Sequence, residues 1–589
     1  MFFTPEKNAV VLYESRRKEW LYFRNPQDVY TVSQLSSVLD TLNEVEHRVQ
    51  KEQLYAAGFI SYEAAPAFDP VLTAQSATGF PLLWFGLYES PEILDFTAPR
   101  KDLSSPAWNP DITELEYGNA IKKIKNYIRE GDTYQVNFTY RLSTDCEFDP
   151  RDFFIRIIQA QGFGFGAYAD IDDWVICSAS PELFFRLHGD NLESRPMKGT
   201  IERGLFKKSD LVNKEWLAAS VKDKAENLMI LDMVRNDMGR IATIGSVRAH
   251  DIFKIEKYPT VWQMTSAVSC KTTADITDIF KALFPAASIT GAPKARTMEI
   301  IRELEHSPRN LYTGTIGYFA PDRTAQFNVA IRTAIINKRD KYAEYGIGGG
   351  IIWDSADYAE FRESRIKARV LSHILPEFSL LETILWTPTD GYFLLDDHLE
   401  RLASSACYFS RQIDIPWICE RLDNLAMEFT YRPHRVRLLV PGEGDPMLEA
   451  AAISKNGGNY RVCFARTPVN AEEDVFLYHK TTRRVVYDRA LAEAPGCDDV
   501  LLFNSKGELT ESCIANIVVE KDASLITPPV ECGLLAGVYR NYLLRQGRIR
   551  EKIITIEDIN SADNLYLINS VRRMWRVVLV GNQTAISSI

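Results

Sequence analysis

The sequence contains no long apolar run and opens without the marks of a secretion signal. No stretch reaches the ~18–20 consecutive apolar residues that a membrane-spanning helix needs. The first residues, MFFTPEKN, lack a basic segment followed by an apolar one. We therefore expect a cytoplasmic protein that is not associated with a membrane.

An excess of positive charge is also absent. The 79 Asp and Glu residues outnumber the 68 Lys and Arg residues, which gives a net charge of −11. Without a broad basic face the chain cannot release phosphate counterions, so nucleic acid is not expected as a partner. A small anionic substrate would need a local cationic pocket.

Cysteine and glycine motifs are missing as well. The glycines Gly162, Gly164 and Gly166 in QGFGFGAY lack the x-x-Gly spacing and following helix of a dinucleotide-binding motif. The nine cysteines show no C-x-x-C or other metal-ligand spacing, which predicts reduced, mostly buried thiols; they are Cys146, Cys177, Cys270, Cys407, Cys419, Cys463, Cys497, Cys513 and Cys532.

The chain is long enough for several domains. Its 589 residues exceed the ~250–300 that one hydrophobic core can serve. A Pro- and Ser-rich stretch at 97–110 and a break near Leu375-Pro376 divide it into 1–105, 106–375 and 376–589. Strand-like runs such as WVICSAS and FNVAIRTAII alternate irregularly with helical patterns such as KDKAENLMILDMVRND, which predicts an α/β or α+β layered fold.

Two titratable residues follow strand-like runs. Glu182 lies in SASPELFF, and Lys198 precedes a glycine turn in RPMKGT. Alone, such a lysine is usually a solvated loop charge. The order of the motifs favours a functional site instead: SPE, RPMKGT, AENLMILDMVRND, SITGAPKARTMEII, YTGTIGYF, FNVAIRT, GIGGGIIWDS and EFRESRIKA follow one another along the chain.

Over residues 112–375 this series resembles the chorismate-utilising enzymes. The family includes anthranilate synthase component I, isochorismate and salicylate synthases, and aminodeoxychorismate synthase component I. The resemblance implies an α+β fold, a large β-sandwich with helices on its outside, which residues 1–100 would complete. It also implies chorismate as the substrate and Mg²⁺ as a cofactor.

The resemblance assigns roles to individual residues. Carboxylates suit a hard cation that prefers oxygen ligands, and those implied to hold Mg²⁺ are Glu226, Glu360 and Glu363. Arg332 and Tyr312 resemble the groups that bind the enolpyruvyl carboxylate. Further implied carboxylate contacts are Thr290, the backbone of Gly348–Gly350, including Gly349 and Gly350, and Lys367. An ordinary acidic surface helix and a structural strand role for Arg332 remain alternatives.

Two positions distinguish the reactions of this family. Isochorismate and salicylate synthases carry a water-activating lysine where this sequence has Gln135, and an amide cannot act as that base. Anthranilate synthases have alanine at the position of Lys198, whereas aminodeoxychorismate synthases have lysine. The resemblance implies that Lys198 attacks C2 of chorismate, that ammonia then adds at C4, and that Glu182 is the general acid and base.

One departure concerns the anthranilate branch. Anthranilate synthases have a histidine that assists pyruvate loss, and the corresponding position in TVWQMTS is Gln263. The substitution is modest support for an enzyme that stops at 4-amino-4-deoxychorismate. Anthranilate synthase-like chemistry remains the main alternative.

From Leu380 onward the sequence resembles the fold-type IV pyridoxal-phosphate enzymes, which have two α+β subdomains. These include branched-chain and D-amino-acid aminotransferases and 4-amino-4-deoxychorismate lyase. The resemblance places Arg401 of HLERL at the cofactor phosphate, Lys480 of YHKTTRR as the Schiff-base lysine and Glu511 of GELTESC at the pyridine nitrogen. The amides of Val538 and Tyr539 in LLAGVYR would hold the phosphate at a helix N-terminus.

The same region departs from its relatives at two positions. Tyr539 stands where threonine is common, and Arg483 stands where asparagine is frequent. An aminotransferase and a degenerate regulatory domain therefore remain alternatives to a lyase.

The two resemblances together imply synthesis of 4-aminobenzoate for folate. Chorismate and ammonia would give 4-amino-4-deoxychorismate, and elimination of pyruvate with pyridoxal phosphate would follow. The sequence has no Cys-His-Glu glutaminase pattern, so a separate glutamine amidotransferase subunit is the expected source of ammonia. A homodimer through the pyridoxal-phosphate domain is a candidate assembly.

Overall fold

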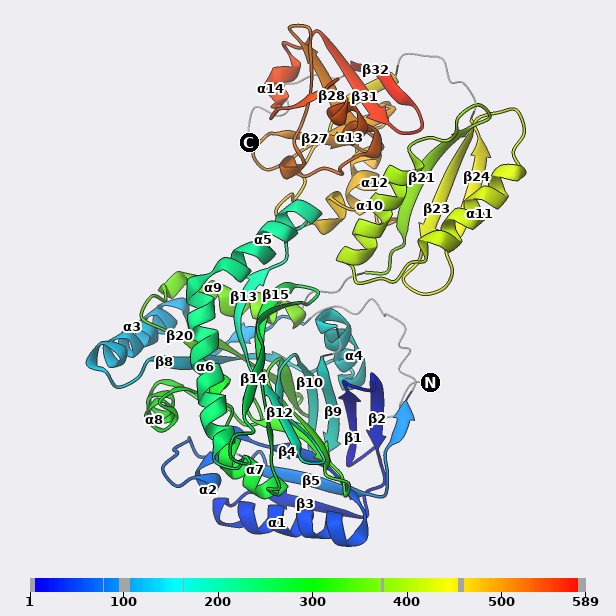
Figure 1. Cartoon of the computed structure of the whole chain (residues 1–589). Helices are drawn as coiled ribbons and strands as arrows, with labels where there is room; N and C mark the ends of the chain where they lie inside the picture. The colour runs from blue at the N-terminus through cyan, green and yellow to red at the C-terminus, as the bar shows by residue number, and fades with distance from the viewer. Residues whose placement is uncertain are drawn as a thin grey trace. The chain divides into compact units, whose positions relative to one another are not determined.

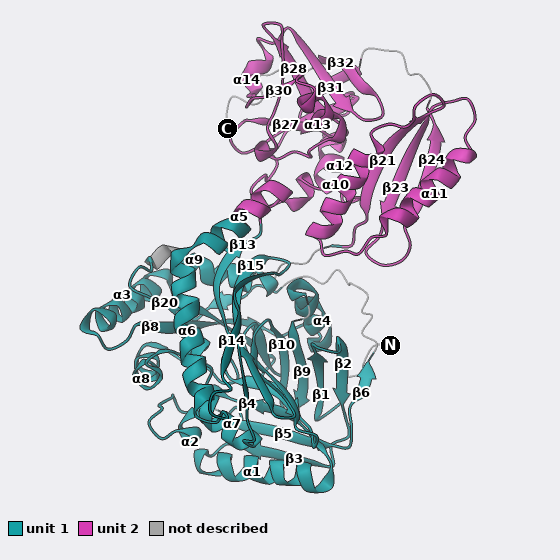
Figure 2. Ribbon diagram, viewed as in Figure 1, with its two compact units in different colours: residues 1–203, 213–376 teal, residues 204–212, 377–589 magenta. Residues whose placement is uncertain are grey.

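The computed structural model describes residues 6–77, 79–94, 106–162, 164–371, 376–453 and 460–580. The chain forms two compact units (Figure 2): Met1–Arg203 with Asn213–Pro376, and Gly204–Val212 with Glu377–Ile589. The expected breaks at 97–110 and Leu375-Pro376 lie partly outside the described residues. No helix in the described ranges is long and apolar enough to cross a membrane.

The first unit contains two ten-stranded sheets. The strands of one sheet are, in order, β16 (Gly291–Ala292), β8 (Gln135–Asp145), β20 (Tyr342–Ile351), β19 (Thr333–Asn337), β10 (Trp174–Ser180), β9 (Phe165–Ile171), β1 (Ala9–Glu14), β2 (Glu19–Phe23) and β6 (Glu92–Leu94), with β7 (Asn109–Pro110) beside β8. Those of the other sheet are β13 (Met197–Glu202), β15 (Val261–Lys271), β12 (Asn191–Arg195), β11 (Leu183–His188), β18 (Thr324–Val329), β17 (Thr315–Phe319), β4 (Tyr55–Ile60), β5 (Leu83–Tyr88) and β3 (Asp28–Val32), with β14 (Arg248–Lys257) beside β15.

Apolar side chains hold these sheets face to face. Phe23, Phe59, Trp84 and Ile176 belong to one buried cluster that joins strands of both sheets. Two further cores cover the outer faces, one with α1 (Leu35–Glu52), α2 (Ala65–Phe68), α6 (Val221–Gly239) and α7 (Ile276–Leu283), the other with α3 (Glu114–Glu130), α4 (Pro150–Gln161), α8 (Lys294–Leu304) and α9 (Asp357–Ala368) (Figure 1). The predicted sandwich with outer helices is confirmed.

The second unit has two sheets with separate cores. The strands of the smaller sheet are β22 (Gly391–Tyr392), β21 (Leu380–Thr387), β23 (His434–Val440) and β24 (Met447–Ala452), which pack with α10 (Leu395–Tyr408) and α11 (Ile415–Met427). The larger sheet has the order β27 (Leu509–Ser512), β26 (Asp499–Phe503), β25 (Tyr460–Phe464), β32 (Arg573–Leu579), β31 (Asn564–Asn569), β28 (Asn516–Lys521), β29 (Ser524–Thr527) and β30 (Arg550–Glu551). Its helices are α12 (Val485–Ala492), α13 (Val538–Arg545) and α14 (Ile556–Ile559), and α5 (Lys207–Ala219) begins within Gly204–Val212.

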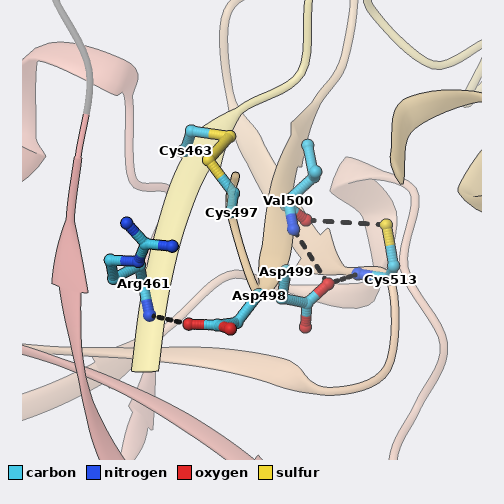
Figure 3. Close-up of a disulfide and its surroundings, with 7 residues drawn as sticks. All are labelled: Arg461, Cys463, Cys497, Asp498, Asp499, Val500 and Cys513. Carbon is cyan, nitrogen blue, oxygen red and sulfur yellow. Dashed lines mark hydrogen bonds between the residues drawn. A yellow bond between two sulfur atoms is a disulfide. The ribbon is translucent and has the colours of Figure 1, made fainter. Parts of the chain in front are cut away.

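One expectation about cysteine was wrong. Cys463 and Cys497 form a disulfide in the second unit (Figure 3). Cys463 is on β25, and Cys497 comes just before the parallel neighbour β26, which brings their Cα atoms to 6.2 Å. That separation lies within the range a disulfide can bridge. Sheet pairing thus joins two cysteines that are 34 residues apart in the sequence.

Candidate active site

A cavity of about 150 Å³ in the first unit brings most of the expected residues together. Strand β13 contributes Lys198, helix α6 contributes Glu226, and helix α9 contributes an acidic pair and a lysine. The expected residues that line it are Glu182, Lys198, Glu226, Tyr312, Arg332, Gly348, Gly350, Glu360, Glu363 and Lys367.

Lys198 lies in a β-bulge. The register between β13 and β15 shifts between Met197 and Thr200, so one extra residue is accommodated there. Gly199 permits this with φ +93°, a conformation that L side chains rarely adopt. The Gln263 amide donates to the Gly199 carbonyl at 2.9 Å and accepts from the Thr200 hydroxyl at 2.8 Å. Gln263 therefore fixes the backbone that directs Lys198.

The second contact to this bulge comes from α6. Asn227 donates to the Lys198 carbonyl at 3.3 Å, and Ser266 donates to Asn227 at 2.5 Å. Neither residue was singled out from the sequence, although Asn227 lies in the AEN motif. The backbone of the bulge that contains Lys198 is therefore hydrogen-bonded to side chains of both β15 and α6.

Glu182 is buried and Lys198 is half-buried, and each side chain lies close enough to feel the charge of the other. Burial lowers the pKa of Lys198, and the Glu226 carboxylate opposes this. Burial raises the pKa of Glu182 to about 7, against the Ser288 hydroxyl, which donates to it at 2.6 Å. A lysine that loses its proton more readily and a carboxyl that keeps one near neutrality suit nucleophile and acid roles. The sequence reasoning missed Ser288, although SITGAP contains it.

The expected metal carboxylates face the cavity with ammonium groups between them. Lys222 Nζ is 4.0 Å from Glu226 and 3.9 Å from Glu360, while Lys367 Nζ is 2.9 Å from Glu363. Burial raises the pKa of Glu226 and of Glu360. Lys222 was not predicted, yet its spacing of four residues before Glu226 is visible in KDKAEN.

Negative charge is in excess in this cavity. Within the described ranges, no three His, Cys, Asp or Glu side chains stand close enough together to hold a metal. Five carboxylates nevertheless line the cavity against four cationic groups, Glu182, Asp223, Glu226, Glu360 and Glu363 against Lys198, Lys222, Arg332 and Lys367. An anionic ligand would require further positive charge here.

Tyr312 and Arg332 also line the cavity. Arg332 follows β18 with φ 50°, so the run FNVAIRTAII is broken there into β18 and β19 instead of forming one strand. The Arg332 guanidinium donates to Gln161. The Tyr312 ring stacks with the guanidinium of Arg141 at 5.2 Å. A half-buried arginine without a carboxylate partner among the described residues can receive an anionic group.

Thr290 and Gly349 do not line the cavity. The Thr290 hydroxyl donates to the Ala286 carbonyl at 3.2 Å, so it is occupied within its own turn. A Cβ at Gly349 would lie 3.6 Å from Glu360 Oε2 and from Lys367 Nζ. Its backbone is therefore adjacent to the acidic and basic groups of α9.

Gly350 lies beside the side chains of both Gln135 and Lys198. A Cβ at Gly350 would meet Gln135 Nε2 at 2.1 Å and Lys198 Nζ at 3.1 Å. The Gln135 side chain is buried, and neither of its amide atoms has a hydrogen-bond partner among the described residues. Because an unpaired buried amide is costly, a bound polar group is the natural partner for it.

A second cavity, of about 370 Å³, lies in the second unit and contains Lys480 and Glu511. Burial, reinforced by the Arg401 charge, lowers the pKa of Lys480 to about 8. Burial raises the pKa of Glu511 to about 7, and the Tyr487 hydroxyl donates to its carboxylate at 2.7 Å. The expected lysine and carboxylate thus share one enclosed space.

Arg401 and the start of α13 lie at the same cavity. Arg401 donates two hydrogen bonds to Glu382, at 2.9 and 2.6 Å, and a longer one of 3.4 Å to the Ala536 carbonyl just before α13. Burial alone would raise the pKa of Glu382, but Arg401 and His398 lower it to about 2. The amides of Val538 and Tyr539 begin α13, and the Tyr539 ring packs against Phe393 and Tyr542.

Comparison with known proteins identifies two family matches along the chain. Residues 8–373 match the model of the chorismate binding enzymes, and residues 379–580 match that of the class IV amino-transferases. Aminodeoxychorismate synthase component 1 of Salmonella typhimurium is 38% identical over 46% of this chain and 59% of its own length. Anthranilate synthase component 1 of Aquifex aeolicus is 35% identical over 45% of this chain and 53% of its own length.

Solved structures share the fold of the first unit. Anthranilate synthase component I from Streptococcus pneumoniae has a TM-score of 0.53 at 23% identity, over 63% of this chain and 94% of that one. The aminodeoxychorismate synthase component 1 proteins of Salmonella typhimurium, Klebsiella aerogenes and Escherichia coli are matched over 59%, 64% and 62% of their lengths. By its match over residues 8–373, the chain belongs to the chorismate binding enzyme family, and a class IV amino-transferase region follows.

Proposed function

We propose that the chain makes 4-aminobenzoate from chorismate in two steps, one in each unit. The first unit would form 4-amino-4-deoxychorismate, and the second would release pyruvate from it. The observation that carries the proposal is the half-buried Lys198, held by a β-bulge in a cavity that it shares with Glu182 and Arg332. Relatives at 35–38% identity that are named aminodeoxychorismate synthase component 1 support the same reaction.

In the first step Lys198 Nζ forms a bond to C2 of chorismate. The ring double bond shifts, the C4–O bond breaks, and the protonated Glu182 supplies the proton with which the hydroxyl leaves as water. Ammonia then bonds to C4, and the C2–N bond to Lys198 breaks. The amide of Gln135 cannot take a proton from water, so water is not activated at this site and ammonia is the incoming nucleophile.

The donor types of this cavity suit Mg²⁺. Glu226, Glu360 and Glu363 offer the oxygen ligands that a hard cation prefers, but among the described residues they do not stand close enough together to form a metal site on their own. The carboxylates that line the cavity outnumber its cationic groups by one, which favours a bound cation. Bound there, the ion would neutralise the ring carboxylate of the substrate. Arg332 and Tyr312 would bind the enolpyruvyl carboxylate, and Gly350 and Lys367 would complete the binding surface.

The second cavity fits pyridoxal phosphate. Lys480 would carry the cofactor, Glu511 would face its pyridine nitrogen, and Arg401 with the amides of Val538 and Tyr539 would hold its phosphate. When bound, the cofactor acts as an electron sink for the amine substrate. Lys480 has a lowered pKa and lies inside the cavity, so it can take and return the proton that pyruvate release requires.

Ammonia would come from a separate glutamine amidotransferase subunit. The relatives from Salmonella, Klebsiella and Escherichia are each named as a component 1, which supports an enzyme of more than one component. The product, 4-aminobenzoate, would then serve folate synthesis. A homodimer through the second unit is part of the same proposal.

Product analysis tests the first step directly. With chorismate, Mg²⁺ and ammonium, the chain should form 4-amino-4-deoxychorismate, and Lys198→Ala should lower the rate by about 10³-fold or more because the nucleophile is lost. Lys224→Ala, on the same helix as Glu226 but outside the cavity, is the matched control. An unchanged rate in Lys198→Ala, or recovery of anthranilate, would refute the assignment.

A further inference from the structure

The second cavity contains far more positive than negative charge. Seven arginines and Lys480 line it, whereas Glu511 is the one carboxylate among its lining residues. A phosphate held by Arg401 and α13 accounts for only part of this excess. The arginines that do not contact this phosphate are either paired within the protein or, where they are solvated, available to a ligand.

Several of the arginines are already engaged. Arg401 binds Glu382 through two hydrogen bonds. Arg540 is almost fully buried and donates to Glu551 at 2.7 Å and to the Pro528 carbonyl. Arg484 donates to the Cys513 carbonyl. These three side chains therefore have fixed structural partners.

Arg435 and Arg483 have no carboxylate partner within hydrogen-bonding or ion-pair distance among the described residues, and both line the cavity. Arg435 is on β23, where its cross-strand neighbours are Leu385 and Ala451, so the sheet offers it no countercharge. The next residue on the same face of the strand, Arg437, pairs with Glu449 at 2.8 Å. Arg435 is exposed and, unlike Arg437, has no anionic partner among the described residues.

Arg483 comes three residues after Lys480 and lies over the ring of Phe476, 5.5 Å from its centre. Phe476 also lines the cavity. The ring contact holds the guanidinium at the cavity wall and leaves its N–H groups free for a planar anion. A guanidinium in this position is suited to carboxylate binding.

We propose that Arg435 and Arg483 bind the carboxylates of a substrate that carries two of them, so that this cavity selects dicarboxylic amines over monocarboxylic ones. This inference rests on the proposed function of the second unit and names the residues that set its substrate class. Both arginines are solvent-exposed. A monocarboxylic amino acid could pair with only one of them and would therefore gain one ion pair fewer than a dicarboxylic amine.

Ligand binding to the full-length holoenzyme tests the proposal without turnover. Benzene-1,3-dicarboxylate and benzoate carry no amine, and the absorbance band of the cofactor reports binding in this cavity alone. We expect the dicarboxylate to bind at least tenfold more tightly than benzoate, and Arg435→Gln or Arg483→Gln to weaken it about tenfold. Arg435→Lys, which keeps the charge, should recover part of the loss.

Arg432→Gln is the matched control, because Arg432 precedes β23, is exposed and does not line the cavity. An unchanged band in the ligand-free variants shows that the cofactor site is intact. Equal affinity for both ligands, or unchanged affinity in both Gln variants, would overturn the proposal. The two proposals can fail separately. If the holoenzyme prefers the dicarboxylate but releases no pyruvate from 4-amino-4-deoxychorismate, the proposed lyase activity is wrong and the proposed carboxylate site is still supported.

Discussion

Gln263 shows how one side chain can act through another. Its amide holds the Gly199 carbonyl at 2.9 Å and thereby the bulge that carries Lys198. We expect Gln263→Leu to lower kcat for 4-amino-4-deoxychorismate formation about 10- to 100-fold with little change in KM, because the nucleophile loses its orientation while the binding groups remain.

Steady-state kinetics with chorismate and ammonium measure this effect. Ser269→Ala, on the same strand but away from the cavity, should leave both constants unchanged. A change confined to KM would mean that Gln263 binds substrate and does not position Lys198.

The pKa of the Glu182 carboxyl should set the pH dependence of the first step. Its pKa is raised to about 7, so the protonated acid is abundant below pH 7 and is lost as the pH rises through that value. The rate limited by proton donation should therefore fall on the alkaline side of about pH 7. Ser288 stabilises the ionised form through its hydrogen bond.

Ser288→Ala should consequently move the alkaline fall upward, by about one pH unit. The measurement is the pH profile of kcat/KM for chorismate in both proteins. Superimposable profiles would remove Glu182 from the role of general acid.

Glycines of strand β20 line the cavity, and the missing side chain at Gly350 leaves room for Gln135 and Lys198. Because a Cβ at Gly350 would collide with Gln135 and crowd Lys198, Gly350→Ala should displace both groups and lower activity about 10²-fold. Circular dichroism and thermal melting should show a folded protein. Gly239→Ala, at the end of α6 where a Cβ meets open space, should behave like the unmodified chain.

Elements with a clear period or motif could be predicted from the sequence. The pattern KDKAENLMILDMVRND predicted α6, and WVICSAS predicted β10. The break at Arg332 could not be predicted, because its positive φ comes from the surrounding fold and not from local propensity. Ser288 and Lys222 were missed for a related reason: their roles depend on which elements the sandwich brings together.

At the scale of the whole molecule, the two proposed reactions should be separable by mutation. Lys480→Ala should accumulate 4-amino-4-deoxychorismate from chorismate, whereas Lys198→Ala should still release pyruvate when given that intermediate. Chromatography of both reaction mixtures measures this. Formation of 4-aminobenzoate at the normal rate by Lys480→Ala would assign the second step elsewhere.

The disulfide should stabilise the second unit. It closes a loop of 34 residues that contains Lys480, and such a loop contributes about 3–4 kcal/mol to the free energy of unfolding. Cys463→Ser should lower the melting temperature of that unit, whereas Cys419→Ser, a free cysteine, should not. Peptide mapping without reductant should recover Cys463 linked to Cys497; free thiols at both positions would contradict the pairing.

The segment Gly204–Val212 belongs to the second unit although the chain on both sides of it belongs to the first. In that unit Phe206 stacks on Tyr478, and His479 contacts the Leu205 carbonyl at 3.2 Å. The chain therefore passes between the units three times, at residues 203/204, 212/213 and 376/377. A gene cut at the last crossing would not yield two complete proteins, since the downstream piece would lack a part of its own core.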